Sequence, residues 1–313
     1  MARVAVVAVG GTSLIKDKKH QSVEDQYACI CETVSHMVDM IQDGWEIVVT
    51  HGNGPQVGFI LLRSEMARTE LHTVPMDSAG ADTQGAIGYQ FQKAFHNEFL
   101  RRGMHKDAAT VVTQVVVGAD DPAFQKPTKP VGPFMDEAQA KERAAADGWA
   151  VMEDAGRGWR RVVPSPKPKK IVELNAIKTL VEAGEVVVAV GGGGVPVVEK
   201  DGMYEGVAAV IDKDYASGLL AANIGADTFL ISTAVEKVYI NFGKPDQKGL
   251  DVVTLEEAKK YMAEGHFAKG SMAPKVEAAI AFLEAGGTSA IITSPENMGK
   301  AVRGESGTRF VRQ

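Results

Sequence analysis

Three stretches of this chain repeat one pattern, a run of β-branched apolar residues that ends in glycines. The runs are VAVVAVGGTSL from Val4, EIVVTHGNGPQVG from Glu46 and EVVVAVGGGGVPV from Glu185. Continuous apolar strands, as opposed to alternating ones, are typical of a parallel sheet that is covered on both faces. Helical segments are predicted at 23–43 and 170–183, between the runs. The sequence therefore predicts a doubly wound α/β fold with a site at the carboxyl edge of the strands.

The alternation resumes in the C-terminal third of the chain. The turn at 212–214 precedes a predicted helix, and strands are predicted at 228–233 and 288–294. Further helices are expected at 255–264 and 274–285, and the final GTRFVRQ is expected to form an edge strand. A chain of 313 residues can form one large α/β domain or two lobes around a cleft.

The segment 118–168 interrupts the alternation. It contains seven prolines and the basic stretch GRGWRR. Its four large aromatic residues, Phe124, Phe134, Trp149 and Trp159, need something to pack against, which disfavours a flexible linker. We expect a protruding flap with short strands of its own.

Composition and charge exclude several classes of protein. The net charge is −6, and no basic tract is interleaved with aromatic residues, which argues against a nucleic-acid partner. No apolar run approaches the roughly 20 residues that span a bilayer, and no cleavage site follows the first strand, so a cytoplasmic protein without a membrane partner is expected. The two cysteines, Cys29 and Cys31, exclude a disulfide framework and lack the partners that a metal site needs.

Glycine clusters at three strand ends favour a phosphate-binding cleft, because glycine lets the backbone approach a ligand and direct N–H groups at anions. The chain has no P-loop sequence and no H-R-D or D-F-G motif. The G-x-G-x-x-x-G spacing at Gly52, Gly54 and Gly58 misses the dinucleotide fingerprint by one position, which disfavours an NAD-dependent oxidoreductase without excluding it.

Three lysines stand in contexts that suit phosphoryl transfer, which needs positioning and charge compensation above all. Lys129 lies between two prolines in KPTKPVG, and Lys213 is flanked by Asp212 and Asp214. Lys275 opens a predicted helix, whose N-terminus is itself an anion site. A single lysine is more often a solvated surface group, but these three contexts favour a role in the cleft.

Long strings across the whole chain resemble carbamate kinases, which belong to the amino-acid-kinase superfamily. The strings are THGNGPQVG, DPAFQKPTKPVGPF, GRGWRRVVPSP, GGGGVPV, GVAAVIDKDYAS, VYINFGKPDQK and GHFAKGSMAPKVEAAI. The resemblance implies a three-layer αβα sandwich with an open, mainly parallel eight-stranded sheet, a small protruding subdomain and a homodimeric molecule. It also implies one domain over 1–313, in which 1–185 holds the acceptor, 118–168 forms the flap and 186–313 holds the nucleotide.

The same resemblance implies the reaction ATP + carbamate ⇌ ADP + carbamoyl phosphate, usually run toward ATP, with Mg²⁺ bound mainly through the nucleotide phosphates. Lys129, Lys213 and Lys275 would neutralise charge on the reacting groups, and Asp214 would orient the lysines. The substrate-binding positions would be Gly10, Gly11, Thr12, Gly52 and Asn53. The nucleotide-binding positions would be Tyr239, Gly243 and Met272, together with Lys213 and Lys275.

Three departures from the family pattern leave alternatives open. Thr12 stands where the first loop usually has asparagine, Asp82 lies in an acceptor-side segment, and Ala234 replaces an acidic residue beside the nucleotide. Thr12 and Asp82 together favour a related kinase for another carbamate-, carboxylate- or ureido-type acid as the main alternative. A non-catalytic sensor of nucleotide or carbamoyl phosphate is the second alternative, and retention of all three lysines disfavours it.

Overall fold

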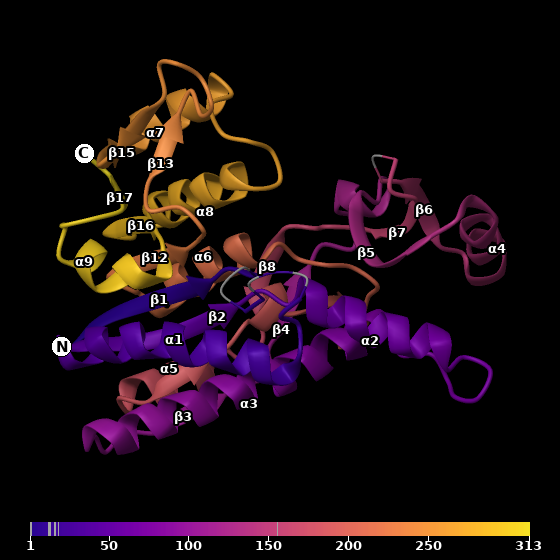
Figure 1. Ribbon diagram of the computed structural model, residues 1–313, viewed down its shortest axis with the longest axis horizontal. Helices are drawn as coiled ribbons and strands as arrows, with labels where there is room; N and C mark the ends of the chain where they lie inside the picture. Colours follow the sequence, from indigo (N-terminus) through magenta and orange to yellow (C-terminus); the bar gives the residue numbers. More distant parts are fainter. Residues whose placement is uncertain (1, 12–13, 16, 18, 155) are drawn as a thin grey trace.

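A central eight-stranded sheet organises the chain (Figure 1). The computed structural model describes residues 2–11, 14–15, 17, 19–154 and 156–313. The strand order is β15-β17-β16-β12-β1-β2-β9-β3, and six strands are mutually parallel while β15 and β17 run the opposite way. The strands are β1 (Arg3–Val9), β2 (Trp45–His51), β3 (Ala108–Thr110), β9 (Val186–Val188), β12 (Thr228–Ser232), β15 (Val252–Thr254), β16 (Ser289–Thr293) and β17 (Thr308–Val311).

The three glycine-ended runs of the sequence form β1, β2 and β9, which are neighbours in the sheet. All three run in the same direction, so the glycines that follow them meet at one edge. This arrangement confirms the predicted α/β fold with a mainly parallel eight-stranded sheet.

Both faces of the sheet are buried, as continuous apolar strands require. Along β1, Ala5, Val7 and Val9 face one core, and Val6 and Ala8 face the other. One face is covered by α1 (Val23–Gln42), α3 (Met76–Arg102) and α9 (Met298–Val302). The other is covered by α5 (Leu174–Glu182), α6 (Lys213–Ile224), α7 (Leu255–Ala263) and α8 (Met272–Glu284).

The proline-rich segment contains a separate three-stranded sheet that projects from the body, at the right of Figure 1. Its strands are β5 (Lys129–Met135), β6 (Ala150–Glu153) and β7 (Trp159–Val163), and α4 (Glu137–Asp147) lies beside them. Pro130 and Pro133 lie in β5, an edge strand, where the missing N–H costs no sheet hydrogen bond. We call residues 118–168 the flap. The helix α2 (Gly54–Met66) packs against β5.

Two smaller sheets complete the fold. A four-stranded sheet has the order β11-β10-β4-β8, and β13 and β14 pair as a hairpin. These strands are β4 (Gln114–Val117), β8 (Pro168–Ile171), β10 (Val195–Lys200), β11 (Met203–Gly206), β13 (Val238–Ile240) and β14 (Lys248–Leu250). Short 3₁₀ turns are η2 (Pro122–Phe124), η3 (Gly191–Gly193) and η4 (Pro295–Asn297).

Two local predictions were wrong. The helix expected at 170–183 begins only at Leu174, because 168–171 pairs with β4 as β8. The C-terminal strand β17 is not an edge strand, since the three-residue strand β15 pairs outside it. Among the described residues, the structure contains no helix with the length and apolar character needed to cross a membrane.

Candidate active site

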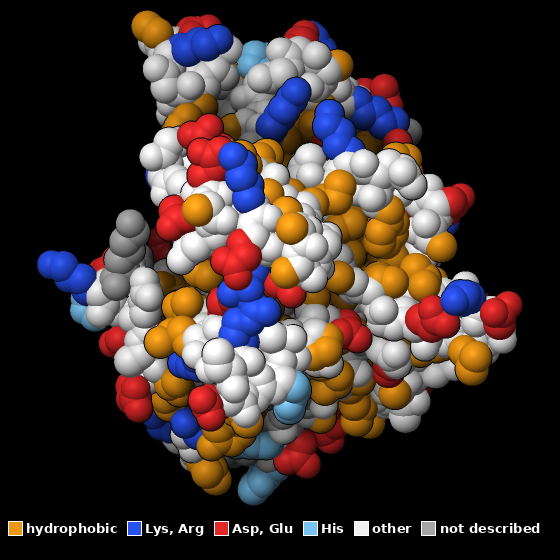
Figure 2. All heavy atoms as spheres, turned by 90° about the vertical axis from the view of Figure 1, so that its right-hand side faces the viewer, with side chains coloured by type: hydrophobic (Ala, Val, Ile, Leu, Met, Phe, Trp, Pro, Cys, Tyr) orange, Lys and Arg blue, Asp and Glu red, His pale blue; other side chains and the backbone are white. Residues whose placement is uncertain are grey.

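A cavity of about 830 Å³ opens at the carboxyl edge of the central strands. It is lined by the segments that follow β2 and β9, by Lys129 of the flap, and by the N-terminal turns of α6 and α8. Loops after β12 and β13 and the segment 264–268 form the remaining wall. Figure 2, viewed from the side on which the flap projects, shows acidic and basic side chains interspersed over this face.

Lys213, Asp214 and Lys275 form a buried ion cluster in this cavity, which we call the lysine–aspartate triad. Lys213 Nζ donates to Asp214 Oδ1 at 2.5 Å, and Lys275 Nζ donates to Asp214 Oδ2 at 2.9 Å. The Asp214 side chain is only 5% exposed. Two ammonium groups share one carboxylate, so the triad leaves one positive charge without a partner inside it. That arrangement suits an anionic ligand.

Helix geometry brings the triad together. Asp212 caps α6, and its side chain accepts a hydrogen bond from the Asp214 N–H at 3.0 Å. The helices α6 and α8 approach closely at Gly218, where a Cβ atom would lie 3.2 Å from the Ala278 carbonyl oxygen. Lys275 lies in the first turn of α8, although the helix begins at Met272, earlier than predicted. Both lysines therefore approach the cavity from helix N-termini, which carry partial positive charge.

Burial and neighbouring charges shift the pKa values in the triad. Burial would raise the pKa of Asp214, but Lys213 and Lys275 outweigh it and hold this pKa below the usual value. Burial lowers the pKa of Lys213, and the Asp214 carboxylate opposes that shift. The carboxylate therefore stays ionised in the cavity, where it can hold both lysine side chains in place.

The glycine segments after β1, β2 and β9 lie against one another. The Gly52 N–H donates to the Val9 carbonyl at 3.1 Å. A Cβ atom on Gly52 would lie 3.5 Å from Gly11 N and 3.6 Å from Lys213 Cδ. The structure thus brings Gly10, Gly11 and Gly52 close to the triad, and of the predicted substrate positions only Thr12 lies outside the described residues. Gly52 lines the cavity, whereas Gly10 and Gly11 are not among the described residues that do.

The segment after β9 needs glycine for steric reasons. Gly192 has a φ of +67°, and a Cβ atom there would lie 2.0 Å from Asn53 Nδ2. Asn53 in turn donates to Thr83 Oγ1 at 2.8 Å, so the amide is held in one orientation. Val190, which precedes these glycines, has a φ of 53°, a rare conformation for a β-branched residue. Such strain is found most often at functional sites.

His51 is a buried neighbour of the triad that the sequence did not single out. Burial lowers its pKa to about 4, and the positive charge of Lys213 contributes to the shift. His51 Nδ1 lies 3.0 Å from the Gly52 carbonyl oxygen. The imidazole is therefore neutral at neutral pH and supports the glycine segment after β2 by packing and hydrogen bonding.

Lys129 enters the cavity from the flap. It is the first residue of β5, and its Nζ lies 3.3 Å from Asp212 Oδ2. Its side chain is 42% exposed, in contrast to the buried lysines of the triad. The sequence shows Asp212 and Asp214 on either side of Lys213, but it does not indicate which lysine each carboxylate binds.

The predicted nucleotide positions lie in or directly beside the same cavity. Tyr239 and Met272 line it, whereas Gly243 lies between two lining residues, Phe242 and Lys244, outside the described lining set. The Tyr239 and Phe242 rings are 6.1 Å apart between centroids. His266 also lines this region, and sequence reasoning missed it because a single histidine in a loop carries no pattern.

Two of the three departures from the family pattern can be placed. Asp82 is exposed on α3, and the next residue, Thr83, makes the contact with Asn53. Asp82 therefore faces solvent, and it is not among the described residues that line the cavity. Ala234 is also exposed, between the lining residues Thr233 and Val235.

Comparison with known proteins identifies the family. The model of the amino acid kinase family matches residues 3–294. A carbamate kinase of Thermococcus kodakarensis is 51% identical, and a carbamate kinase-like protein of Escherichia coli, YahI, is 50% identical, each over the full length of both chains. The solved structure of carbamate kinase from Giardia lamblia bound to AMP-PNP superposes with a TM-score of 0.96 at 40% identity, over 99% of this chain and 98% of that one. The chain therefore belongs to the amino acid kinase family, and within that family it groups with the carbamate kinases.

Proposed function

We propose that this protein is a carbamate kinase, which catalyses ATP + carbamate ⇌ ADP + carbamoyl phosphate. The observation that carries the proposal is the triad, in which Asp214 holds two lysine ammonium groups in a glycine-lined cavity. The likeness to carbamate kinases over the full chain supports the same acceptor. The direction toward ATP, usual in the family, is part of the proposal.

Charge compensation is the main catalytic task. The transferred phosphoryl group carries negative charge on its oxygens, and preorganised cations in a water-poor site stabilise it without reorganising. Lys213 and Lys275 would take this role, with Asp214 keeping them in position. The carbamate oxygen is already anionic, so it can attack the γ-phosphorus without a general base, and ADP leaves as the bond to its β-phosphate oxygen breaks.

The acceptor would bind on the flap side of the triad, among Gly10, Gly11, Thr12, Gly52 and Asn53. Lys129 would give up Asp212 and bind the negatively charged carbamoyl or phosphoryl oxygens. We assign the acceptor to residues 1–185, including the flap at 118–168, and the nucleotide to residues 186–313.

The nucleotide would occupy the other end of the cavity, near Tyr239, Gly243 and Met272. Mg²⁺ fits this arrangement as a companion of the nucleotide. Among the described residues no three metal-binding side chains gather in one place, and Asp214 already bonds to two lysines. Mg²⁺ commonly binds through substrate phosphates and keeps several waters, so here it would be held mainly through the nucleotide phosphates and would offset part of their charge. A homodimer and a cytoplasmic location stay predictions.

A coupled assay tests the proposal directly. Purified protein with carbamoyl phosphate, ADP and Mg²⁺ should form ATP at about 1–100 s⁻¹, the usual range for kinases. ADP binding without turnover would favour the sensor, and faster turnover with another carbamate-, carboxylate- or ureido-type acyl phosphate would favour the related kinase. Restoring the family pattern with Thr12→Asn and Asp82→Met should then leave a true carbamate kinase unchanged and improve carbamoyl phosphate use in the related kinase.

A further inference from the structure

A second set of polar contacts joins α6 to α8 beside the triad. Tyr215 follows Asp214 on α6, and Glu277 lies two residues after Lys275 on α8. The Tyr215 hydroxyl donates a short hydrogen bond to Glu277 Oε2. Burial and then the Glu277 carboxylate raise the pKa of Tyr215, so the hydroxyl stays protonated and holds the ring in one orientation.

The third member of this set comes from the base of the flap. Lys167 lies in the segment between β7 and β8, and its Nζ is 3.2 Å from the centre of the Tyr215 ring. The same Nζ lies 3.8 Å from Glu277 Oε2. The Lys167 N–H donates at 3.0 Å to Asp121 Oδ2, and Asp121 caps η2 near the N-terminal end of the flap. Lys167 therefore connects both chain segments at the base of the flap to α6 and α8.

The flap thus has two cationic attachments to the first turn of α6. Lys129 contacts Asp212 within the cavity, and Lys167 contacts Tyr215. Under the proposed function, Lys129 must leave Asp212 when the substrate binds. The residues that line the cavity include Lys129 and Asp212 but not Lys167, Tyr215 or Glu277. The attachment through Lys167 can therefore persist while Lys129 changes partner.

We propose that Lys167 and Tyr215, with Glu277 orienting the tyrosine, are positioning residues that hold the flap in a fixed position relative to the triad. They touch neither substrate, and they act through Lys129, which they keep within reach of the phosphoryl group bound by Lys213 and Lys275. This inference rests on the proposed function. A merely stabilising contact would instead affect melting temperature and the use of both substrates alike.

The first experiment compares Lys167→Met with Lys169→Met as a matched control. Lys169 is two residues further along, is similarly exposed, and pairs with Asp120 at 3.6 Å, whereas Lys167 contacts Tyr215 and Glu277. Losing a cation–π contact and an exposed ion pair should raise the KM for carbamoyl phosphate about fivefold. The KM for ADP should stay within about twofold, and the control should match the parent. Tyr215→Leu, which removes the ring, should reproduce the effect of Lys167→Met.

A double-mutant cycle tests whether Lys167 acts through Lys129. If it does, adding Lys167→Met to Lys129→Ala should change the KM for carbamoyl phosphate by less than about twofold, because the group being positioned is already absent. The same fivefold change in both backgrounds would overturn the proposal.

Hydrogen exchange separates this inference from the proposed activity, since it needs no turnover. In the ligand-free protein, Lys167→Met should speed amide exchange in β5 and β7 relative to Lys169→Met, because the flap loses an attachment. Faster exchange in a protein that makes no ATP would support the attachment and overturn the proposed activity. An active parent in which Lys167→Met and Lys169→Met show the same exchange and the same KM values would overturn the attachment and leave the activity standing.

Discussion

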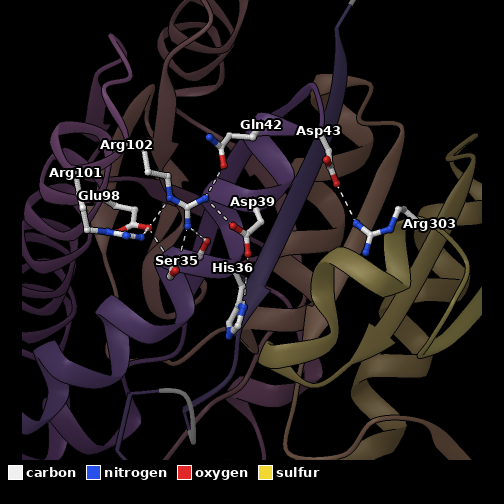
Figure 3. Close-up of polar contacts among 9 residues, drawn as sticks. All are labelled: Ser35, His36, Asp39, Gln42, Asp43, Glu98, Arg101, Arg102 and Arg303. Carbon is white, nitrogen blue, oxygen red and sulfur yellow. Dashed lines mark hydrogen bonds and ion pairs between the residues drawn. The ribbon is translucent and has the colours of Figure 1, made fainter.

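The triad and the ion network between α1 and α3 are both built from cationic side chains and carboxylates, but only the network pairs every cation with a carboxylate. In the network, shown in Figure 3, all five contacts of the Arg102 guanidinium go to neighbouring oxygens at 2.6–3.1 Å. Glu98, Asp39, Gln42 and Ser35 supply those oxygens. In the triad, one carboxylate serves two ammonium groups.

The difference lies in whether the protein itself satisfies each charge. In the network, Glu98 also accepts from Arg101, so two guanidinium groups face two carboxylates, Glu98 and Asp39. A network whose donors and acceptors are all paired holds two helices together and leaves no charge free to bind a ligand. The triad has one positive charge more than its single carboxylate can balance, and it faces a cavity. A surplus of buried cations therefore distinguishes the candidate active site from an ion network of comparable size.

The largest expected effect is at the triad. Lys213→Ala should lower kcat by about 10²–10³, because one preorganised charge at a phosphoryl-transfer centre is worth roughly 3–4 kcal/mol. Steady-state ATP formation measures it. Lys106→Ala is the matched control, since Lys106 is equally buried and bonds to Glu46 at 2.5 Å outside the cavity. A Lys213 variant within about threefold of the parent would contradict the role.

Next in size is the loss of the Arg102 network. Arg102→Ala should reduce the free energy of unfolding by about 2–3 kcal/mol, because it removes charged hydrogen bonds from a side chain only 13% exposed. Activity per folded molecule should not change. Arg101→Ala provides the control: its side chain is 65% exposed, and the expected cost is below about 1 kcal/mol. Urea titration distinguishes the two, and equal losses would refute the contrast.

A smaller effect is expected at Lys129, which combines features of both regions. It bonds to a carboxylate in the resting cavity, yet it is proposed to bind the acceptor. Lys129→Ala should raise the KM for carbamoyl phosphate about tenfold, the value of one charged hydrogen bond of about 1.4 kcal/mol. ADP affinity, measured by calorimetry, should change much less. An equal loss of ADP affinity would place Lys129 with the nucleotide.

The smallest effect is the pH dependence of the network. Hydrogen bonds from Arg101 and then Arg102 lower the pKa of Glu98 to about 2. A carboxylate with a depressed folded pKa stabilises the protein above its unfolded pKa near 4.5, and this contribution is lost as pH falls toward 2. We expect about 1 kcal/mol after solvent screening. Unfolding measured between pH 5 and pH 3 should show a shallower loss in Glu98→Gln, and identical slopes would exclude the contribution.

Much of the fold could be predicted because its signal is local. Continuous apolar runs with glycine ends indicated β1, β2 and β9, and the helices predicted at 23–43 and 255–264 match α1 and α7 to within one residue. The three-residue strand β15 escaped prediction, since so short a strand has no periodicity and exists only through its pairing with β17. That pairing decided that β17 is not an edge strand.

For the candidate site, too, the sequence indicated the local features, and the tertiary structure decided the contacts between them. The sequence by itself determined which residue types were available: three lysines in constrained contexts, Asp214 next to Lys213, and glycines after strands. Only the tertiary structure decided that Lys213 and Lys275 share one carboxylate, that Lys129 contacts Asp212, and that Asp82 faces solvent while Thr83 bonds to Asn53. The physical reason is separation along the chain: Lys275 lies 61 positions after Asp214, and Asp212 lies 83 positions after Lys129. Contacts at such distances depend on how the helices and the flap pack onto the sheet, and no local pattern records them.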